Sequence, residues 1–149
     1  SVLYVADSRG QPALMCRTES GSGQPLVEGV ENFHVLYGID GDNDSVTDRY
    51  MRADQLIVAG NDAATKATWN MVRSIKIGLI LRSSVGETQE TASQTLYPFG
   101  NARASASAAV GSAFANSAND PGTVASAPAD RRLRLQTSFT IHLRNEQNL

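Results

Sequence analysis

The sequence predicts a β-rich α+β domain, built mainly of antiparallel strands joined by long connections. Residues 69–82 and 133–144 alternate apolar and polar side chains, and residues 2–18 show a hairpin pattern. At 149 residues the chain has the usual length of one domain, and 41% hydrophobic with 19% charged residues is typical of a folded globular protein. We therefore expect a single head domain over residues 1–149.

The hairpin comes first in the chain. Two short apolar runs, Leu3–Val5 and Ala13–Cys16, flank the segment 7–12, which is dense in turn-forming residues. Residues 20–25 are rich in Gly and Ser, which offer little side chain to bury. We predict two paired strands followed by a flexible connector.

The next strand is predicted from Val30 onward. Phe33, Val35 and Tyr37 fall on one face, and this period of two indicates a half-buried strand. The stretch 49–60 is compatible with a short helix or with an irregular strand, and both alternatives stay open.

The two longest strands have the clearest patterns. Residues 69–82 place Ile75, Ile77, Leu79 and Leu81 on one face, and Ile80 makes the other face partly apolar, which favours a central position in a sheet. Residues 133–144 carry one apolar face and one polar face, as in an antiparallel sheet that is solvated on one side.

A compositionally biased insertion separates these strands. Residues 83–130 are rich in Ala, Ser, Gly, Asn and Thr, a composition that buries too little apolar area to offset its ordering entropy. We predict one short Ala-rich helix near 102–115. Residues 97–99, Tyr-Pro-Phe, are expected to attach part of the insertion to the body.

An acidic loop follows the strand that begins at Val30. Its carboxylates occupy loop positions one, three, five and nine, at Asp40, Asp42, Asp44 and Asp48. Ca²⁺ takes six to eight oxygen ligands, and a backbone carbonyl at Val46 would supply a further one. These five residues form the predicted calcium site, and Ca²⁺ is the cofactor that the sequence suggests.

Two features argue against a helix–loop–helix calcium site. The sixth position is Ser45 where such loops carry Gly, and the twelfth is Met51 where they carry a bidentate Glu. The alternative is a solvated acidic turn, because Asp, Asn and Gly are good turn residues. Clustered carboxylates repel each other unless they are neutralised, and Arg49 and Arg52 are the nearby cations expected to do so.

Several functional classes find no support. A net charge of −2 offers no electrostatic footprint for nucleic acid, and no apolar run approaches the ~20 residues of a membrane span. His34 and His142 are interpreted as surface residues, so no catalytic site is predicted and the chain is expected not to be an enzyme. The single cysteine, Cys16, is either a small buried hydrophobe or half of a disulfide whose partner precedes Ser1.

Arginines gather on the last predicted strand and just before it. They are Arg131, Arg132, Arg134 and Arg144. One interpretation is an edge strand guarded by charge against unwanted pairing. The other is a basic docking face for an acidic partner.

Three segments together resemble the PilW family of minor pilins, or pseudopilins, of type IV pilus systems. They are residues 26–50, with the motif Glu-Gly-Val-Glu-Asn-Phe-His-Val-Leu-Tyr-Gly-Ile-Asp, residues 69–82, and residues 131–145. The first segment is the most specific of the three. The insertion at 83–130 has no counterpart in the resemblance.

The resemblance implies a non-enzymatic, pilin-like periplasmic head whose hydrophobic N-terminal helix is absent from this chain. It also implies anchoring in the inner membrane of a Gram-negative bacterium before assembly, and a later position at the extracellular pilus tip. There the protein would prime assembly with other minor pilins beneath a large adhesin. Family members often carry a cysteine shortly before this region, which implies a partner for Cys16.

Two other functions stay open. A J-type pseudopilin of type II secretion is the nearest alternative within the superfamily. A calcium-binding extracellular adhesion module is the alternative from a different class, because the acidic loop would then be central to ligand contact.

Overall fold

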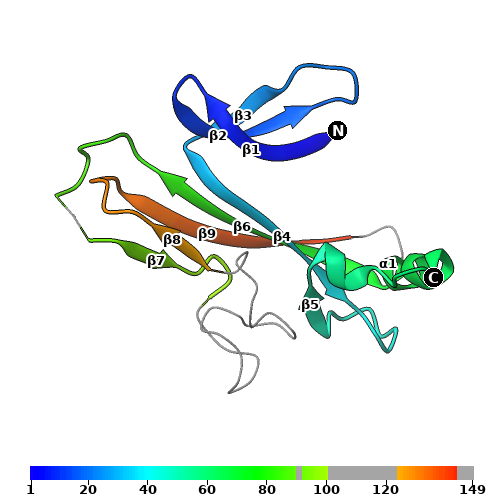
Figure 1. Ribbon diagram of the computed structural model, residues 1–149. Helices are drawn as coiled ribbons and strands as arrows, with labels where there is room; N and C mark the ends of the chain where they lie inside the picture. Colours follow the sequence, from blue (N-terminus) through cyan, green and yellow to red (C-terminus); the bar gives the residue numbers. More distant parts are fainter. Residues whose placement is uncertain (90–91, 101–123, 144–149) are drawn as a thin grey trace.

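The protein is mainly β in the computed structural model, which describes residues 1–89, 92–100 and 124–143 (Figure 1). Strands make up 49% of these residues and helical segments 11%, with a single α-helix among them. The predicted α+β class, with its pilin-like α+β head, is therefore wrong, because alternating strands dominate the described chain. The Ala-rich helix predicted near 102–115 lies outside the described residues.

The first sheet contains three antiparallel strands, β1 (Val2–Ser8), β2 (Gln11–Arg17) and β3 (Gln24–Glu28). The predicted hairpin is confirmed, and its turn is closed by the Gly10 N–H, which donates to Asp7 Oδ1 at 3.0 Å. The predicted connector at 20–25 is shorter than expected, because β3 already begins at Gln24.

The second sheet contains four antiparallel strands in the order β5-β4-β6-β9. Their bounds are β4 Val30–Ile39, β5 Arg49–Met51, β6 Val72–Arg82 and β9 Arg134–His142. The predicted central position of β6 is confirmed, since β6 pairs with both β4 and β9.

A 3-10 helix η1 (Ala53–Leu56) and the helix α1 (Asp62–Asn70) connect β5 to β6. Both alternatives for 49–60 therefore occur, one after the other. Asn61 caps α1 by accepting a hydrogen bond from the Ala64 N–H at 2.9 Å. Trp69 and Asn70 belong to α1, so β6 begins three residues later than predicted.

A small core lies where these connections meet the second sheet. Leu56 of η1 is completely buried and lies in one cluster with the buried residues Ile39 and Val72, and Met51 packs against them. Tyr37 meets the Trp69 ring edge to face, with centroids 4.8 Å apart. The connection therefore covers one end of the sheet, at the acidic loop.

A two-stranded ribbon, β7 (Gln94–Leu96) and β8 (Ala125–Ala127), covers part of one face of the second sheet. Phe99, which follows the ribbon, is buried, and a Cβ at Gly78 of β6 would lie only 2.8 Å from its ring. Glycine at 78 thus allows the close approach. The prediction that residues 97–99 attach to the body is confirmed.

The first sheet stands on the other side of the four-stranded sheet from the ribbon (Figure 1). The chain passes between the two sheets at Gly29, whose φ of 79° favours glycine. Its N–H donates to the Pro12 carbonyl at 2.7 Å, and its carbonyl accepts from the Arg82 N–H at 2.8 Å. Within the described ranges we find no helix with the length and apolar character of a membrane span.

Candidate functional site

The four-stranded sheet has one predominantly apolar face. Strand register sets Val35 opposite Ile77, and Ile77 opposite Phe139, so side chains of three strands share this face. On β9 the face is open, with exposed fractions of 65% for Leu135 and 47% for Phe139. The sequence predicted that only the polar face of this strand would be wet, and this prediction is wrong.

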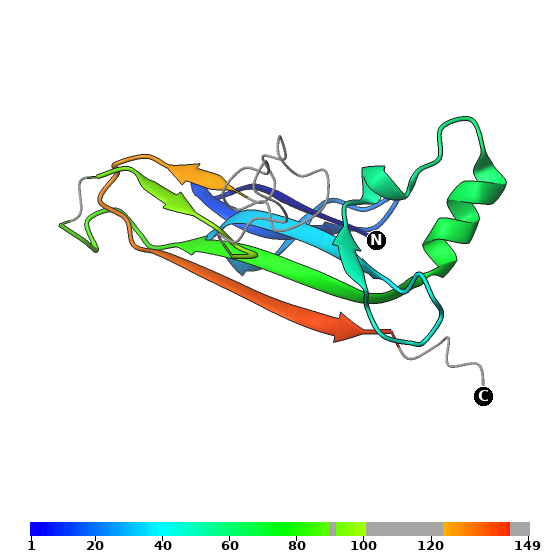
Figure 2. The same cartoon turned by 90° about the horizontal axis from the view of Figure 1, so that it is seen from below.

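The opposite face of the sheet has more polar side chains than the apolar face, yet more of its side chains are buried. Ile80 and Leu36 are buried there, as are Ser74 and Gly78, and the segment around Phe99 lies against Gly78. β9 forms the outer edge of the sheet, and β6 is the strand that pairs with it in the part of the chain described (Figure 2). An edge position explains why both faces of β9 are exposed.

The acidic loop connects β4 to β5 and is organised around Asp40. The Asp40 carboxylate is buried and accepts from the Ser45 N–H at 3.0 Å, the Asp44 N–H at 3.2 Å and Arg73 Nε at 3.1 Å. Burial alone would raise the pKa of Asp40, but these hydrogen bonds outweigh it and lower the pKa. The first predicted calcium ligand is thus held ionised by the protein itself.

The other loop carboxylates are exposed. Asp48 accepts from the Gly41 N–H at 2.6 Å, and Asp44 Oδ1 accepts from the Val46 N–H at 2.8 Å. The negative charge of Asp44, assisted by burial and by Asp48 and Asp40, raises the pKa of Asp42. Like charges therefore remain close together on this side of the loop.

Three of the predicted metal ligands come together. Carboxylate oxygens of Asp40, Asp42 and Asp48 lie within 4.8 Å of one another, while Asp44 is outside this group. Ser45 has a φ of 68°, so it adopts the left-handed conformation that glycine would favour at the sixth position. The arrangement offers oxygen ligands for a hard cation, and calcium at Asp40, Asp42, Asp44, Val46 and Asp48 stays a prediction.

The arginine that contacts the loop is not one of the two expected. Arg73, at the start of β6, donates to Asp40 and, through Nη2, to Asn43 Oδ1 at 3.0 Å. Arg52 instead pairs with Asp54 at 2.9 Å. Arg73 is 33 residues from Asp40, so no local sequence signal could have found this contact.

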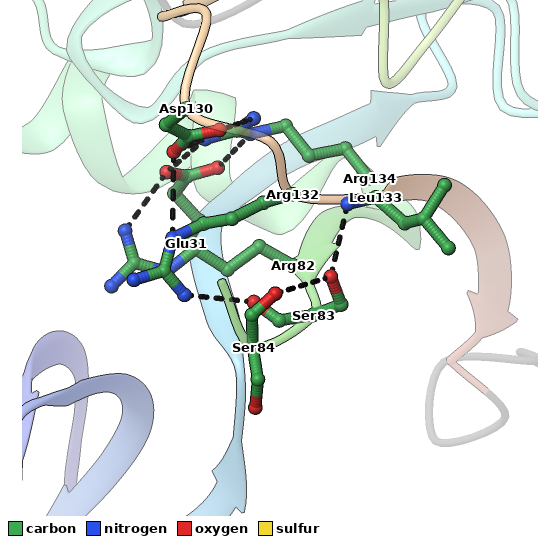
Figure 3. Close-up of polar contacts among 8 residues, drawn as sticks. All are labelled: Glu31, Arg82, Ser83, Ser84, Asp130, Arg132, Leu133 and Arg134. Atoms are coloured by element: carbon green, nitrogen blue, oxygen red, sulfur yellow. Dashed lines mark hydrogen bonds and ion pairs between the residues drawn. The ribbon is translucent and has the colours of Figure 1, made fainter. Parts of the chain in front are cut away.

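A second charged group was missed by the sequence reasoning (Figure 3). We call it the ion-pair cluster, and it contains Glu31, Arg82, Asp130, Arg132 and Arg134. The Arg134 side chain is 1% exposed; its Nε donates to Glu31 at 2.7 Å and its Nη2 to Asp130 at 2.7 Å. The prediction of an exposed basic face is therefore wrong for Arg134, because its guanidinium is buried and paired with Glu31 and Asp130.

The cluster connects the ends of three segments. Arg82 ends β6 and reaches Glu31 on β4 at 3.4 Å, while Arg132, before β9, donates to the Ser83 carbonyl at 2.9 Å. The Arg134 hydrogen bond, opposed by burial, lowers the pKa of Glu31, and the same guanidinium lowers the pKa of Asp130. These carboxylates in turn raise the pKa of Arg134.

The remaining candidates lie apart on separate strands. Cys16 is a free, half-buried cysteine on β2, His34 is half-buried on β4, and His142 is exposed at the end of β9. Their placement leaves the two interpretations of Cys16 open.

Comparison with models of protein families identifies a match for this chain. The family model for type IV pilus-assembly protein W matches residues 2–145, nearly the whole chain. The searches of curated proteins and of solved structures gave no match. Because the family model covers far more than half of the chain, the protein belongs to the PilW family, type IV pilus-assembly protein W, and its role lies in type IV pilus assembly at the cell envelope.

Proposed function

We propose that the protein is a non-enzymatic minor pilin that primes type IV pilus assembly and becomes part of the tip complex. Its partners would be other minor pilins and a large tip adhesin. Before assembly, a hydrophobic N-terminal helix would anchor it at the periplasmic face of the inner membrane. The observation that supports this proposal best is the open apolar face of the four-stranded sheet.

Contiguous exposed apolar surface usually marks a protein or membrane contact. Here Ile77 of the central strand is only half-buried, and Phe139 and Ile141 beside it are 47% and 45% exposed. An assembly subunit needs such a face, because it must bury apolar area against a helix or a neighbouring subunit. An enzyme would instead be expected to carry a concave, mostly apolar pocket with a few convergent polar groups.

Two alternative functions can be distinguished from this proposal by experiment. A J-type pseudopilin of type II secretion would use the same apolar face in a different assembly. A calcium-binding adhesion module is favoured by the close carboxylates of Asp40, Asp42 and Asp48, and it would depend on the loop rather than on the sheet face.

Gene deletion followed by complementation tests the proposal. We expect deletion to reduce the number of surface pili several-fold and the wild-type gene to restore them. An Ile77→Thr variant, which keeps the β-branch but removes the terminal methyl and adds a hydroxyl, should restore them poorly. Val58→Thr alters an apolar side chain that is 43% exposed outside the sheets and should complement fully.

Other outcomes separate the alternatives. Normal piliation with a loss of protein secretion would replace the proposal by the type II pseudopilin. Normal piliation with a loss of calcium-dependent adhesion would replace it by the adhesion module. Full complementation by Ile77→Thr, with the variant folded, would remove the apolar face as its support.

A further inference from the structure

We propose that β9 is a docking edge at which a second copy of this chain adds its own β9. The two strands would run antiparallel about a two-fold axis at Ser138, which joins the two four-stranded sheets into one. The proposal stands on the geometry of this edge and does not depend on the role in pilus assembly.

The β9 edge lacks the usual protection against strand pairing. Natural edges are short, charged, bulged or interrupted by proline. Within the described ranges, β5 is three residues long and carries Arg49, and β3 carries Pro25 and Glu28. β9 is nine residues long, its register with β6 has no shift, and it contains no proline and no Asp, Glu, Lys or Arg from Leu135 to His142.

The sequence of β9 is self-complementary. With Ser138 opposite Ser138 of the second copy, Leu135 comes opposite Ile141 and Thr137 comes opposite Phe139. Directly opposite residues in an antiparallel pair lie on the same face. The apolar face would thus continue from one copy into the other, and the polar face would do the same.

The surface beside β9 can also receive side chains of the second copy in this register. An open hollow of about 360 Å³ lies at the start of the strand, lined by Leu81, Ser83, Leu133 and Leu135, together with Arg82 and Arg134. Ile141 and Leu143, at the other end, are 45% and 40% exposed. In the proposed register these two side chains of the second copy fall beside Leu135 and Leu133, at the rim of the hollow.

Two-fold symmetry forms this contact twice, once at each end of the strand pair. The contact area remains that of one strand pair and its flanking side chains, below the roughly 1,200 Å² of a standard stable interface. We therefore expect a weak, reversible dimer. Its fraction should rise with protein concentration over roughly 10 µM to 1 mM, the range in which small interfaces associate.

Cysteine cross-linking tests the register directly. In a Cys16→Ser background, Ser138→Cys places two thiols on directly opposite residues, whose Cα atoms would be about 4.5–5.5 Å apart and within disulfide reach. Thr140→Cys is the matched control, since it lies on the same face and is also exposed. In the proposed register its two copies are four positions apart, roughly 13 Å, so it should cross-link at least about tenfold more slowly because the thiols are out of reach.

Sedimentation of the full chain tests the edge itself. Leu135→Lys introduces a charge on the edge and should leave the protein monomeric. Leu3→Lys, at a side chain that is 47% exposed on the first sheet, should dimerise like the wild type. Circular dichroism checks that both variants fold. If Leu135→Lys does not fold, the cross-linking of Ser138→Cys against Thr140→Cys tests the proposal instead. The proposal is overturned by a wild type that stays monomeric, by equal cross-linking at 138 and 140, or by a folded Leu135→Lys variant that still dimerises.

Discussion

The acidic loop and the ion-pair cluster solve the problem of close charges in opposite ways. The loop gathers like charges within nine residues of sequence, exposes most of them, and supports Asp40 with backbone N–H groups and Arg73. The cluster gathers opposite charges from β4, β6, β9 and the residues just before β9, and it buries Arg134 between two carboxylates. The loop is conspicuous in the sequence, whereas the cluster exists only in the fold.

The difference teaches that local charge density is a poor guide to structural importance. Exposed charges are screened by water, so rearranging them costs little. A buried charge that loses its partner pays its desolvation cost without compensation. The cluster should therefore dominate stability, and the loop should respond mainly to ions.

The largest expected effect comes from the centre of the cluster. Arg134→Met leaves Glu31 and Asp130 without their main partner and should lower the free energy of unfolding by about 3 kcal/mol, measured by urea denaturation. Arg131→Met changes an exposed neighbour and should alter stability by less than about 0.5 kcal/mol. Equal effects of the two variants would contradict a special role for the cluster.

The second-largest effect is expected from acid, which should weaken the ion-pair cluster. The pKa values of Glu31 and Asp130 are lowered in the fold from ordinary values of 4.5 and 3.8. Groups with lowered pKa values stabilise the protein above their ordinary pKa, and this contribution is lost as the pH falls through the folded value. Melting temperature should thus fall as the pH drops below about 4.5. Arg134→Met should show a flatter decline, and an unchanged pH profile in this variant would argue against the assignment.

A smaller effect is expected at the loop. Arg73→Met removes the hydrogen bonds to Asp40, to Asn43 and to the Asn70 carbonyl but leaves the backbone N–H donors in place. We expect a loss of about 1–2 kcal/mol in the free energy of unfolding. Arg49→Met, at the exposed arginine that the sequence suggested as a neutralising cation, is the control and should be nearly neutral. The comparison fails if Arg49→Met is the more damaging change.

The smallest change in stability is expected from Asp42→Asn. Because the charge of Asp44 raises the pKa of Asp42, removing the Asp42 charge relieves repulsion and should raise the melting temperature slightly at pH 7. If the loop binds calcium as predicted, millimolar Ca²⁺ should raise the wild-type melting temperature and do so less in the variant. Calorimetric titration after chelator treatment that shows no heat, with no shift in melting temperature, would remove calcium from this loop.

Strand positions could be predicted from the sequence because alternation is a local property. It located the first hairpin, β4, the central β6 and β9. It misplaced the start of β6, since Trp69 and Asn70 continue the same apolar–polar alternation although Asn61 caps a helix that includes them. The α+β class was wrong because strands dominate the described residues, whereas the Ala-rich helix expected near 102–115 lies outside them.

Contacts between distant segments could not be predicted. Glu31 and Arg134 are separated by 103 residues, and nothing near either residue indicates the other. Alternation in β9 shows which residues share a face, but it does not reveal whether another element covers that face. For this reason Leu135 and Phe139 were expected inside and are found exposed. Three of the four predicted loop carboxylates lie together, Asp44 lies outside the group, and the arginine that contacts the loop comes from β6.

The β7–β8 ribbon fixes the two ends of the segment that joins its strands but does not fix the length of that segment. Leu96 leaves the ribbon opposite Ala125, where the chain returns, so the intervening residues begin and end at one place. Doubling the length of such a connection costs only about 0.6 kcal/mol of loop-closure entropy. We therefore expect a change in the length of this connection to leave the register of both sheets, and with it the edge at β9, the same.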